Sequence, residues 1–398
     1  MLFPAAYAKM YLQELFLSMP YHSNQSFLRR VRMKIGCVKE IKAHEYRVGM
    51  TPSNAAEYVK NSHQVYIETK AGEGSGFTDE EYARAGALIV DSAADIWPLC
   101  DMVVKVKEPL PEEYSFMRKD QIIFTYLHLA ADLTLTKAML ESNCIGVAYE
   151  TITDKKGGLP LLKPMSEIAG RLSVQEGAKY LEKPFGGRGI LMSGVPGVKN
   201  AKVVVLGGGT VGTNACKMAL GLGADVTVLD MSLDRLTYLD DMFNGKIKTL
   251  FSTDTSIENE IRDADVVIGA VLIPGASAPK LIKKEHLKTM KKGAVMVDVA
   301  VDQGGCFETT KPTYHHDPVY EVDGVLHYCV ANMPGAVPNT STTALTNATL
   351  KYGLMIANLG LEKAAELDAG LKNGINIYKG KCTCKNVADC FDIECVQL

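Results

Sequence analysis

Four residues of the chain could do chemistry at the ends of predicted β-strands: Arg47, Lys107, His128 and Asp302. In open parallel sheets, ligands bind beyond the carboxyl ends of the strands. The Arg47 guanidinium could grip a carboxylate with two hydrogen bonds, and Lys107 could pair with a carboxylate or polarise a carbonyl. His128 could transfer protons near neutral pH, and Asp302 could assist proton transfer or stabilise a cationic iminium.

Each of these residues also has a purely structural interpretation. A single arginine or lysine is more often a solvated surface residue. A histidine such as His128 is about as often structural as functional, and Asp302 could simply cap a turn. Singly, none of the four identifies a reaction.

The sequence GGGTVG predicts a phosphate-binding turn between a strand and a helix. Gly207 permits the tight turn out of the strand, and Gly209 lets a pyrophosphate approach the backbone. Gly212 lets the helix pack close to the sheet. The free N–H groups and positive end of the helix favour the phosphate charge. An ordinary glycine turn is the weaker interpretation, because a second predicted strand and an acid follow.

That acid is Asp230, where a carboxylate can accept hydrogen bonds from both hydroxyls of an adenosine ribose. It would repel a 2′-phosphate, so the sequence favours NAD over NADP. Arg235 is near enough in sequence to soften this preference. An NAD site on one domain and anion-binding residues on another suggest hydride transfer involving a small substrate that carries a carboxylate.

The composition is that of a globular protein of more than one domain. The chain has 398 residues, of which 47% are hydrophobic and 22% charged, and two domains are the expectation for this length. A net charge of −3 without a long basic run gives no indication of a nucleic-acid partner. No stretch reaches the roughly 18 uninterrupted apolar residues of a membrane helix. We therefore expect neither nucleic acid nor membrane as a partner.

Ten cysteines are spread along the chain without the density of a disulfide scaffold, which favours free thiols in a reducing compartment, the cytoplasm. Cys382, Cys384, Cys390 and Cys395 lie in the tail. Their spacing does not match the usual zinc pairs, and no histidine is nearby. We predict no metal site.

The first 32 residues stand apart, with Lys9, Arg29, Arg30 and Arg32 against one acid, Glu14. Basic, acid-poor composition is found in transit peptides. We prefer an extension upstream of the fold, because a clean strand pattern begins at Met33.

From there, strand-like and helix-like segments alternate, which predicts an α/β fold with two doubly wound, parallel, Rossmann-like domains. We expect residues 161–338 to form the NAD-binding domain. Residues 33–160 and 339–398 would form a discontinuous substrate domain. Long helices at 161–180 and 339–361 would join it to the NAD-binding domain. The predicted strands are 34–38, 64–68, 88–90, 102–106, 121–127, 145–149, 203–206, 226–229, 264–270, 294–299 and, as the last of the NAD-binding domain, 325–330.

From residue 33 to about 380, the chain resembles the alanine dehydrogenase family, which includes the NAD(H)-binding part of proton-translocating transhydrogenase. The motifs that carry the resemblance include KEIKAHEYRVGMTP, VKVKEPLPEEY, TYLHLAA, AYETI, VVVLGGGTVG, VDVAVDQGGCFE and YCVANMPGAVPNTSTTALTNAT. The departures are the first 32 residues and the cysteine-bearing tail.

The resemblance implies reversible NAD-dependent oxidative deamination of L-alanine to pyruvate and ammonium. It also implies a homohexamer in which the two domains of each subunit close over a cleft. It implies that Arg47 and Lys107 hold the substrate, and that His128 and Asp302 are the catalytic proton-handling pair. The implied NAD contacts are Ser166, Gly207, Gly209, Thr210, Val211, Gly212, Asp230, Arg235, Ser252, Val271, Leu272, Val299, Ala300, Val301, Asp302, Val330, Ala331, Asn332 and Met333.

Two other functions stay open. The chain could be a transhydrogenase component that relays hydride without an amino-acid substrate, but this requires membrane spans or a membrane partner. It could also be a non-catalytic NAD-sensing or scaffold protein, which would bind NAD without turnover.

Overall fold

The computed structural model describes residues 32–271 and 278–398, which lie in one compact unit, Arg32–Leu398. The predicted N-terminal extension lies outside the described residues, except for the exposed Arg32. Leu272, one of the predicted NAD contacts, also lies outside them.

In the described part of the chain, the first sheet has eight strands in the order β15-β14-β6-β5-β4-β1-β2-β3. Strands β1 to β6 are parallel, and β14 pairs antiparallel with β6. Strands β4, β5 and β6 are apolar or nearly so and are buried along their whole length, as expected for parallel strands covered on both faces. The bounds are β1 Lys34–Cys37, β2 Gln64–Glu68, β3 Leu88–Val90, β4 Met102–Val104, β5 Ile122–Thr125, β6 Ile145–Ala148, β14 Ile375–Tyr378 and β15 Lys381–Cys382.

The second sheet has the order β12-β13-β11-β10-β7-β8-β9. All its described pairs are parallel except β12 with β13. The order reverses between β7 and β10, which is where a doubly wound sheet opens a crevice for ligands. The bounds are β7 Lys202–Leu206, β8 Asp225–Asp230, β9 Lys248–Phe251, β10 Val266–Gly269, β11 Val295–Asp298, β12 Val319–Val322 and β13 Val325–Tyr328.

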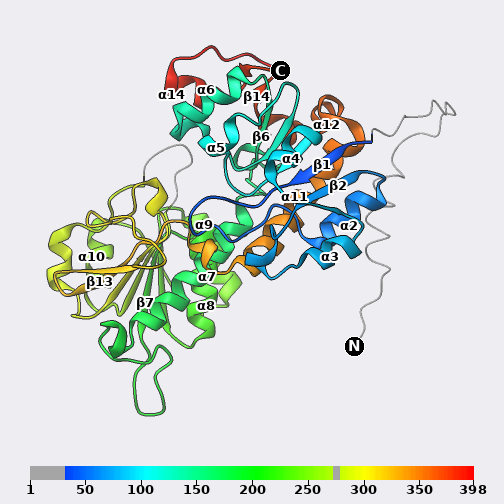
Figure 1. The fold of residues 1–398 in the computed structure, drawn as a ribbon. Coiled ribbons are helices and arrows are strands. Elements are labelled where there is room, and N and C mark those ends of the chain that lie inside the picture. Colours follow the sequence, from blue (N-terminus) through cyan, green and yellow to red (C-terminus); the bar gives the residue numbers. More distant parts are fainter. Residues whose placement is uncertain (1–31, 272–277) are drawn as a thin grey trace, which may run out of the picture. The chain divides into compact units, whose positions relative to one another are not determined.

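Helices connect the parallel strands (Figure 1). Threonines cap the helices that begin at Pro52 and Asp79: the Thr51 and Thr78 side chains accept the N–H groups of Asn54 and Glu81. The bounds are α2 Pro52–Lys60, α3 Asp79–Arg84, α4 Ala93–Leu99, α5 Pro111–Tyr114, α6 Leu133–Glu141, α7 Lys163–Tyr180, α8 Thr210–Gly221, α9 Leu233–Phe243, α10 Asp254–Arg262, α11 Pro338–Leu359, α12 Leu361–Leu367, α13 Ala369–Gly374 and α14 Lys385–Phe391.

The long helices α7 and α11 pack against each other and join the two sheets (Figure 1). Leu345 and Ile356 of α11 lie in a core of the first sheet, whereas Ile168 and Leu172 of α7 lie in a core of the second. Met165 packs against both cores. The α/β class and the two parallel, Rossmann-like sheets are therefore confirmed. The domain limits at 160/161 and 338/339 stay a prediction.

Every predicted strand has a counterpart, and β13, which lies within residues 325–330, is the last strand of the second sheet, as expected. Strands β14 and β15 were not predicted; they extend the first sheet beyond β6. Strands β9 and β12 were not predicted. Both are edge strands with partly exposed residues, so their apolar pattern is weak.

Among the helices in the described ranges, none is long and apolar enough to cross a bilayer. The structure describes all ten cysteines and shows each as a free thiol. Within the described residues, no group of three or more His, Cys, Asp or Glu side chains is placed to hold a metal ion.

The glycine turn places α8 in close contact with the end of β7. Gly207 has a φ of +96°, which favours glycine. A Cβ on Gly212 would lie 1.8 Å from the Gly207 carbonyl oxygen, so only glycine fits without displacing the backbone. A Cβ on Gly209, in contrast, would have no heavy atom within 4 Å among the described residues.

We predict that Gly212→Ala lowers the free energy of unfolding by about 1–3 kcal/mol, because the added methyl group must push α8 away from the turn. NAD affinity should fall as well. Chemical denaturation and calorimetric titration with NAD measure the two effects.

Gly221→Ala is the matched control, since Gly221 ends the same helix and a Cβ there meets no atom of the described residues within 4 Å. It should leave NAD affinity unchanged and stabilise the protein by up to about 1 kcal/mol. Equal effects of the two substitutions would contradict this account of the turn.

Candidate active site

The structure brings Arg47, Lys107, His128 and Asp302 to one cavity with a volume of about 170 Å³. Lys107, His128 and Asp302 follow strands β4, β5 and β11, so they come from the carboxyl ends of both sheets. The rest of the lining is mostly apolar: Tyr126, Leu162, Met165, Ser166, Ala169, Val211, Val299, Val330, Asn332, Met333 and Pro334.

The loop that carries Lys107 is held by a buried carboxylate. Glu40 accepts the backbone N–H groups of Val106 and Lys107, at 2.6 and 3.2 Å. Glu40 also pairs with the fully buried ammonium group of Lys105, which in turn donates to Glu113 at 2.8 Å. With its backbone fixed in this way, Lys107 extends from the loop into the cavity.

His128 lies in an unusual backbone conformation, with a φ of +49°. Glu150, which follows β6, accepts the backbone N–H groups of Leu127 and His128 at 3.1 and 2.6 Å. The imidazole is half-exposed, and its Nδ1 lies 3.9 Å from Glu150 Oε1. The ring stacks on that of Tyr126, with centroids 5.8 Å apart and planes inclined by 6°. These contacts orient the imidazole in the cavity.

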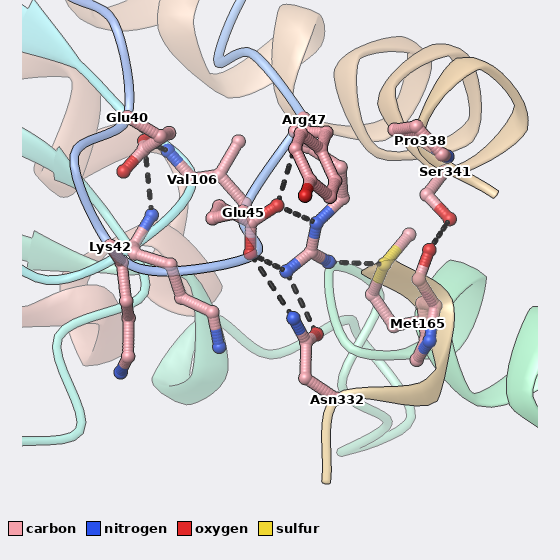
Figure 2. Close-up of polar contacts among 12 residues, drawn as sticks. Glu40, Lys42, Glu45, Arg47, Val106, Met165, Asn332, Pro338 and Ser341 are labelled. Carbon is pink, nitrogen blue, oxygen red and sulfur yellow. Dashed lines mark hydrogen bonds and ion pairs between the residues drawn. The ribbon is translucent and has the colours of Figure 1, made fainter. Parts of the chain in front are cut away.

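Arg47 is buried, and its guanidinium is already paired (Figure 2). Nε and Nη2 each donate to a carboxylate oxygen of Glu45 at 2.6 Å. Nη2 also donates to Asn332 Oδ1 at 2.9 Å, and Nη1 contacts Met165 Sδ at 3.1 Å. The edge formed by Nε and Nη2 could bind a substrate carboxylate with two hydrogen bonds, but in the structure Glu45 occupies it. We call this the paired edge.

Asp302 lies in a short 3-10 turn, Val301–Gln303, and its side chain is exposed. The loop is held by the buried Asp298 at the end of β11, which accepts the N–H groups of Ala300 and Cys306 at 3.0 and 2.8 Å. Burial raises the pKa of the Asp298 carboxyl group, although these hydrogen bonds lower it in part.

A second cavity, of about 430 Å³, lies at the glycine turn. It shares Ser166 and Val211 with the first cavity, so the two adjoin. Its lining includes these predicted NAD contacts: Ser166, Gly207, Gly209, Thr210, Val211, Asp230, Ser252 and Val271. The open space at Gly209 and the N-terminus of α8 are what a pyrophosphate requires, so these residues fit a dinucleotide.

Asp230 connects the end of β8 to the glycine turn. Its Oδ2 accepts the Gly208 N–H at 2.7 Å, and its Oδ1 accepts the Ser232 N–H at 2.8 Å. Arg235 donates to the Gly208 carbonyl and to Thr213 Oγ1. Arg235 thus braces the turn, and it is not among the residues that line the second cavity.

The other predicted NAD contacts divide between the cavities and their supports. Val299, Val330, Asn332 and Met333 line the first cavity. Ala331 lines a third cavity together with Lys107, His128 and Asp302. Gly212, Ala300 and Val301 are buried. The individual roles of all these residues stay predictions.

The supporting carboxylates were not predicted from the sequence; they are Glu40, Glu45, Glu150 and Asp298. A signal for most of them was present, because Glu40, Glu150 and Asp298 stand at or just beyond the ends of predicted strands, as Asp302 does. Glu45 had a weaker signal, an acid two residues before the candidate arginine.

Two segments of the chain match the two domain models of one known family. Residues 36–169 match "Alanine dehydrogenase/PNT, N-terminal domain", and residues 173–385 match "Alanine dehydrogenase/PNT, C-terminal domain". An alanine dehydrogenase of Halomonas elongata is 55% identical over 365 residues, which are 92% of this chain and 98% of that protein.

Solved structures agree with this result. A structure titled L-alanine dehydrogenase is 53% identical, covers 90% of this chain and 99% of its own, and has a TM-score of 0.88. A transhydrogenase from Sinorhizobium meliloti is 25% identical over 88% of this chain and 99% of its own, with a TM-score of 0.77.

We predict that binding of a small carboxylate weakens as the pH rises through the lowered pKa of Lys107. Burial lowers this pKa most, and the nearby positive charge of Arg47 lowers it further. Because the ammonium form binds the anion, affinity should be highest below this pKa and fall above it. The dissociation constant of oxamate, measured across pH with NADH present, reports the change.

Lys107→Arg is the comparison, because a guanidinium stays charged over the same range. The oxamate affinity of Lys107→Arg should not fall over the pH range in which the parent protein loses affinity. This holds even if the two proteins differ in affinity at low pH. If the parent protein bound oxamate equally well up to the pH at which an ordinary lysine titrates, Lys107 would not be the anion-binding group.

Proposed function

The chain belongs to the alanine dehydrogenase/PNT family, and we propose that it catalyses the reversible NAD-dependent oxidative deamination of L-alanine to pyruvate and ammonium. The observation that carries the proposal is the meeting of Arg47, Lys107, His128 and Asp302 at one cavity that adjoins the glycine-turn cavity.

NAD, when bound, supplies the hydride acceptor. The residues that would hold it are those of the glycine turn, the N-terminus of α8 and Asp230. The Asp230 carboxylate would accept hydrogen bonds from the ribose hydroxyls and repel a 2′-phosphate, which favours NAD over NADP.

Arg47 and Lys107 would hold the substrate carboxylate and the oxygen of the 2-oxo group. The small volume of the cavity and its apolar lining suit a methyl side chain. A methyl group offers little to contact, so discrimination against a substrate larger by one methylene should be about 1–3 kcal/mol.

His128 and Asp302 would handle the protons. Nδ1 of His128 is the ring atom nearer to Glu150, which leaves Nε2 available to take a proton from the substrate or from water. After hydride leaves Cα, water adds to the resulting imine, and ammonium departs as pyruvate forms. The exposed Asp302 carboxylate would favour the cationic iminium and share in the proton transfer.

Two properties carried by the family resemblance remain proposals of finer detail: a homohexameric assembly and a cytoplasmic location. Light scattering of the purified protein tests the first, and fractionation of the source cells tests the second.

The test of the function is one spectrophotometric assay that follows NADH, first with L-alanine and NAD, then with pyruvate, ammonium and NADH. Turnover in both directions by purified protein without any membrane component supports the proposal. A transhydrogenase component or a non-catalytic NAD-binding protein would bind NAD(H) but give no change with L-alanine.

We predict that His128→Ala lowers kcat at least ~100-fold, because a positioned general acid–base group typically contributes a factor of this size. The dissociation constant of NAD should stay within about twofold of the parent value, since His128 does not line the glycine-turn cavity. His286→Ala, in the 3-10 segment Lys284–Thr289 outside both cavities, serves as the control. An unchanged kcat would remove His128 from the mechanism.

We also predict that Asp230→Ala weakens NAD about 10-fold or more and narrows the preference for NAD over NADP, because hydrogen bonds to a charged group contribute about 1.5–3 kcal/mol. The control is Asp225→Ala at the exposed start of the same strand, where the aspartate pairs with Lys248. Calorimetry with both dinucleotides gives the ratio. Equal NAD affinity in Asp230→Ala and parent would contradict the ribose assignment.

A further inference from the structure

The guanidinium of Arg47 has five N–H donors, and the Glu45 carboxylate accepts hydrogen bonds from two of them. The Nε and Nη2 edge makes two 2.6 Å hydrogen bonds to the Glu45 carboxylate. Nη1 contacts only a thioether, that of Met165, among the described residues. A thioether is a weak acceptor, so Nη1 holds the least committed donors of the group.

Glu45 is as fully buried as Arg47, the residue with which it pairs. The exposed fractions of the two side chains are 2% for Arg47 and 1% for Glu45. Glu45 Oε1 also accepts the Arg47 backbone N–H at 3.1 Å. Burial alone would raise the pKa of Glu45, but hydrogen bonds and charge from Arg47 lower it overall, so the carboxylate stays ionised.

Asn332 closes the arrangement from the other sheet. Its Oδ1 accepts from Arg47 Nη2 at 2.9 Å, and its Nδ2 donates to Glu45 Oε2 at 3.2 Å (Figure 2). It has a φ of +57° in the loop between β13 and the 3-10 turn Met333–Ala336. The loop before α2 and the loop after β13 are therefore joined through one arginine.

Two arrangements of a bound substrate follow from these contacts. The substrate carboxylate could displace Glu45 from the paired edge of Arg47, which would leave a buried carboxylate without its cation. Breaking a buried ion pair is strongly unfavourable. Alternatively, it could approach the Nη1 edge and Lys107, which also lines the cavity, and leave the Glu45 pair intact.

We propose that Glu45 is a positioning residue: it occupies the paired edge of Arg47 and so presents the Nη1 edge, together with Lys107, to the substrate carboxylate. The inference rests on the proposed function and assigns which atoms of the site receive the substrate.

The two arrangements predict opposite effects when Glu45 is replaced. If Glu45 positions Arg47, its loss lets the guanidinium rotate and weakens substrate binding. If Glu45 competes with the substrate for Arg47, its loss frees the paired edge and strengthens binding. The sign of the change in KM therefore distinguishes them.

The experiment measures steady-state kinetics of Glu45→Gln with L-alanine at saturating NAD. We expect KM for L-alanine to rise about 10-fold or more, while kcat changes less than about threefold and the dissociation constant of NAD is unchanged. Glu57→Gln is the matched control, since the Glu57 side chain is half-exposed on α2 and pairs with Lys60. A KM that is unchanged or lower in Glu45→Gln overturns the proposal.

Rescue by formate gives a readout that a purely structural role would not move. In the parent protein, formate should compete with the substrate and raise its KM. In Glu45→Ala, formate can occupy the space left by the carboxylate, restore the orientation of Arg47 and lower KM. Formate that raises KM equally in both proteins would contradict the positioning role.

If Glu45→Ala fails to fold, Glu45→Asp replaces it, because it keeps the charge but shortens the reach by one methylene. Its KM should lie between those of the parent and Glu45→Gln, and a value equal to that of Glu45→Gln would count against the proposal. Failure of the proposed function is separate, since the parent protein itself would then not turn over L-alanine.

Discussion

Carboxylates that accept backbone N–H groups hold the loops on which the candidate site depends. Glu40 after β1 holds the loop after β4, and Glu150 after β6 holds the loop after β5. Asp230 at the end of β8 holds the glycine turn after β7. Asp298 does the same for its own loop. Each carboxylate thereby fixes the backbone of the loop that it contacts, and does so more strongly when it is ionised.

This arrangement explains how two separate sheets can supply one site. Parallel strands end at the same edge, and Glu40, Glu150 and Asp230 each tie their own strand to the loop of a neighbour. The positions of Lys107 and His128 are then set by the sheet order, in which β6, β5, β4 and β1 are consecutive. The helices α7 and α11 join this sheet to the one that carries the glycine turn.

The sequence predicted most of this fold because the parallel strands are apolar runs with clear ends. It also predicted the four chemistry-bearing residues that line the first cavity, but not the supporting carboxylates that stand at other strand ends. It did not predict β9 and β12, whose edge positions need no continuous apolar run. Nor could it predict that Arg47 pairs with Glu45 and Asn332, because 285 residues separate Arg47 from Asn332 in the chain.

In the proposed function, the carboxylate-bearing substrate and the dinucleotide occupy adjoining cavities, so that hydride passes between them directly. The most direct measurement uses L-alanine deuterated at Cα and follows the label by mass spectrometry of the NADH formed. Direct transfer predicts one deuterium per NADH without dilution by solvent hydrogen. Label released into water, with unlabelled NADH, would contradict the account.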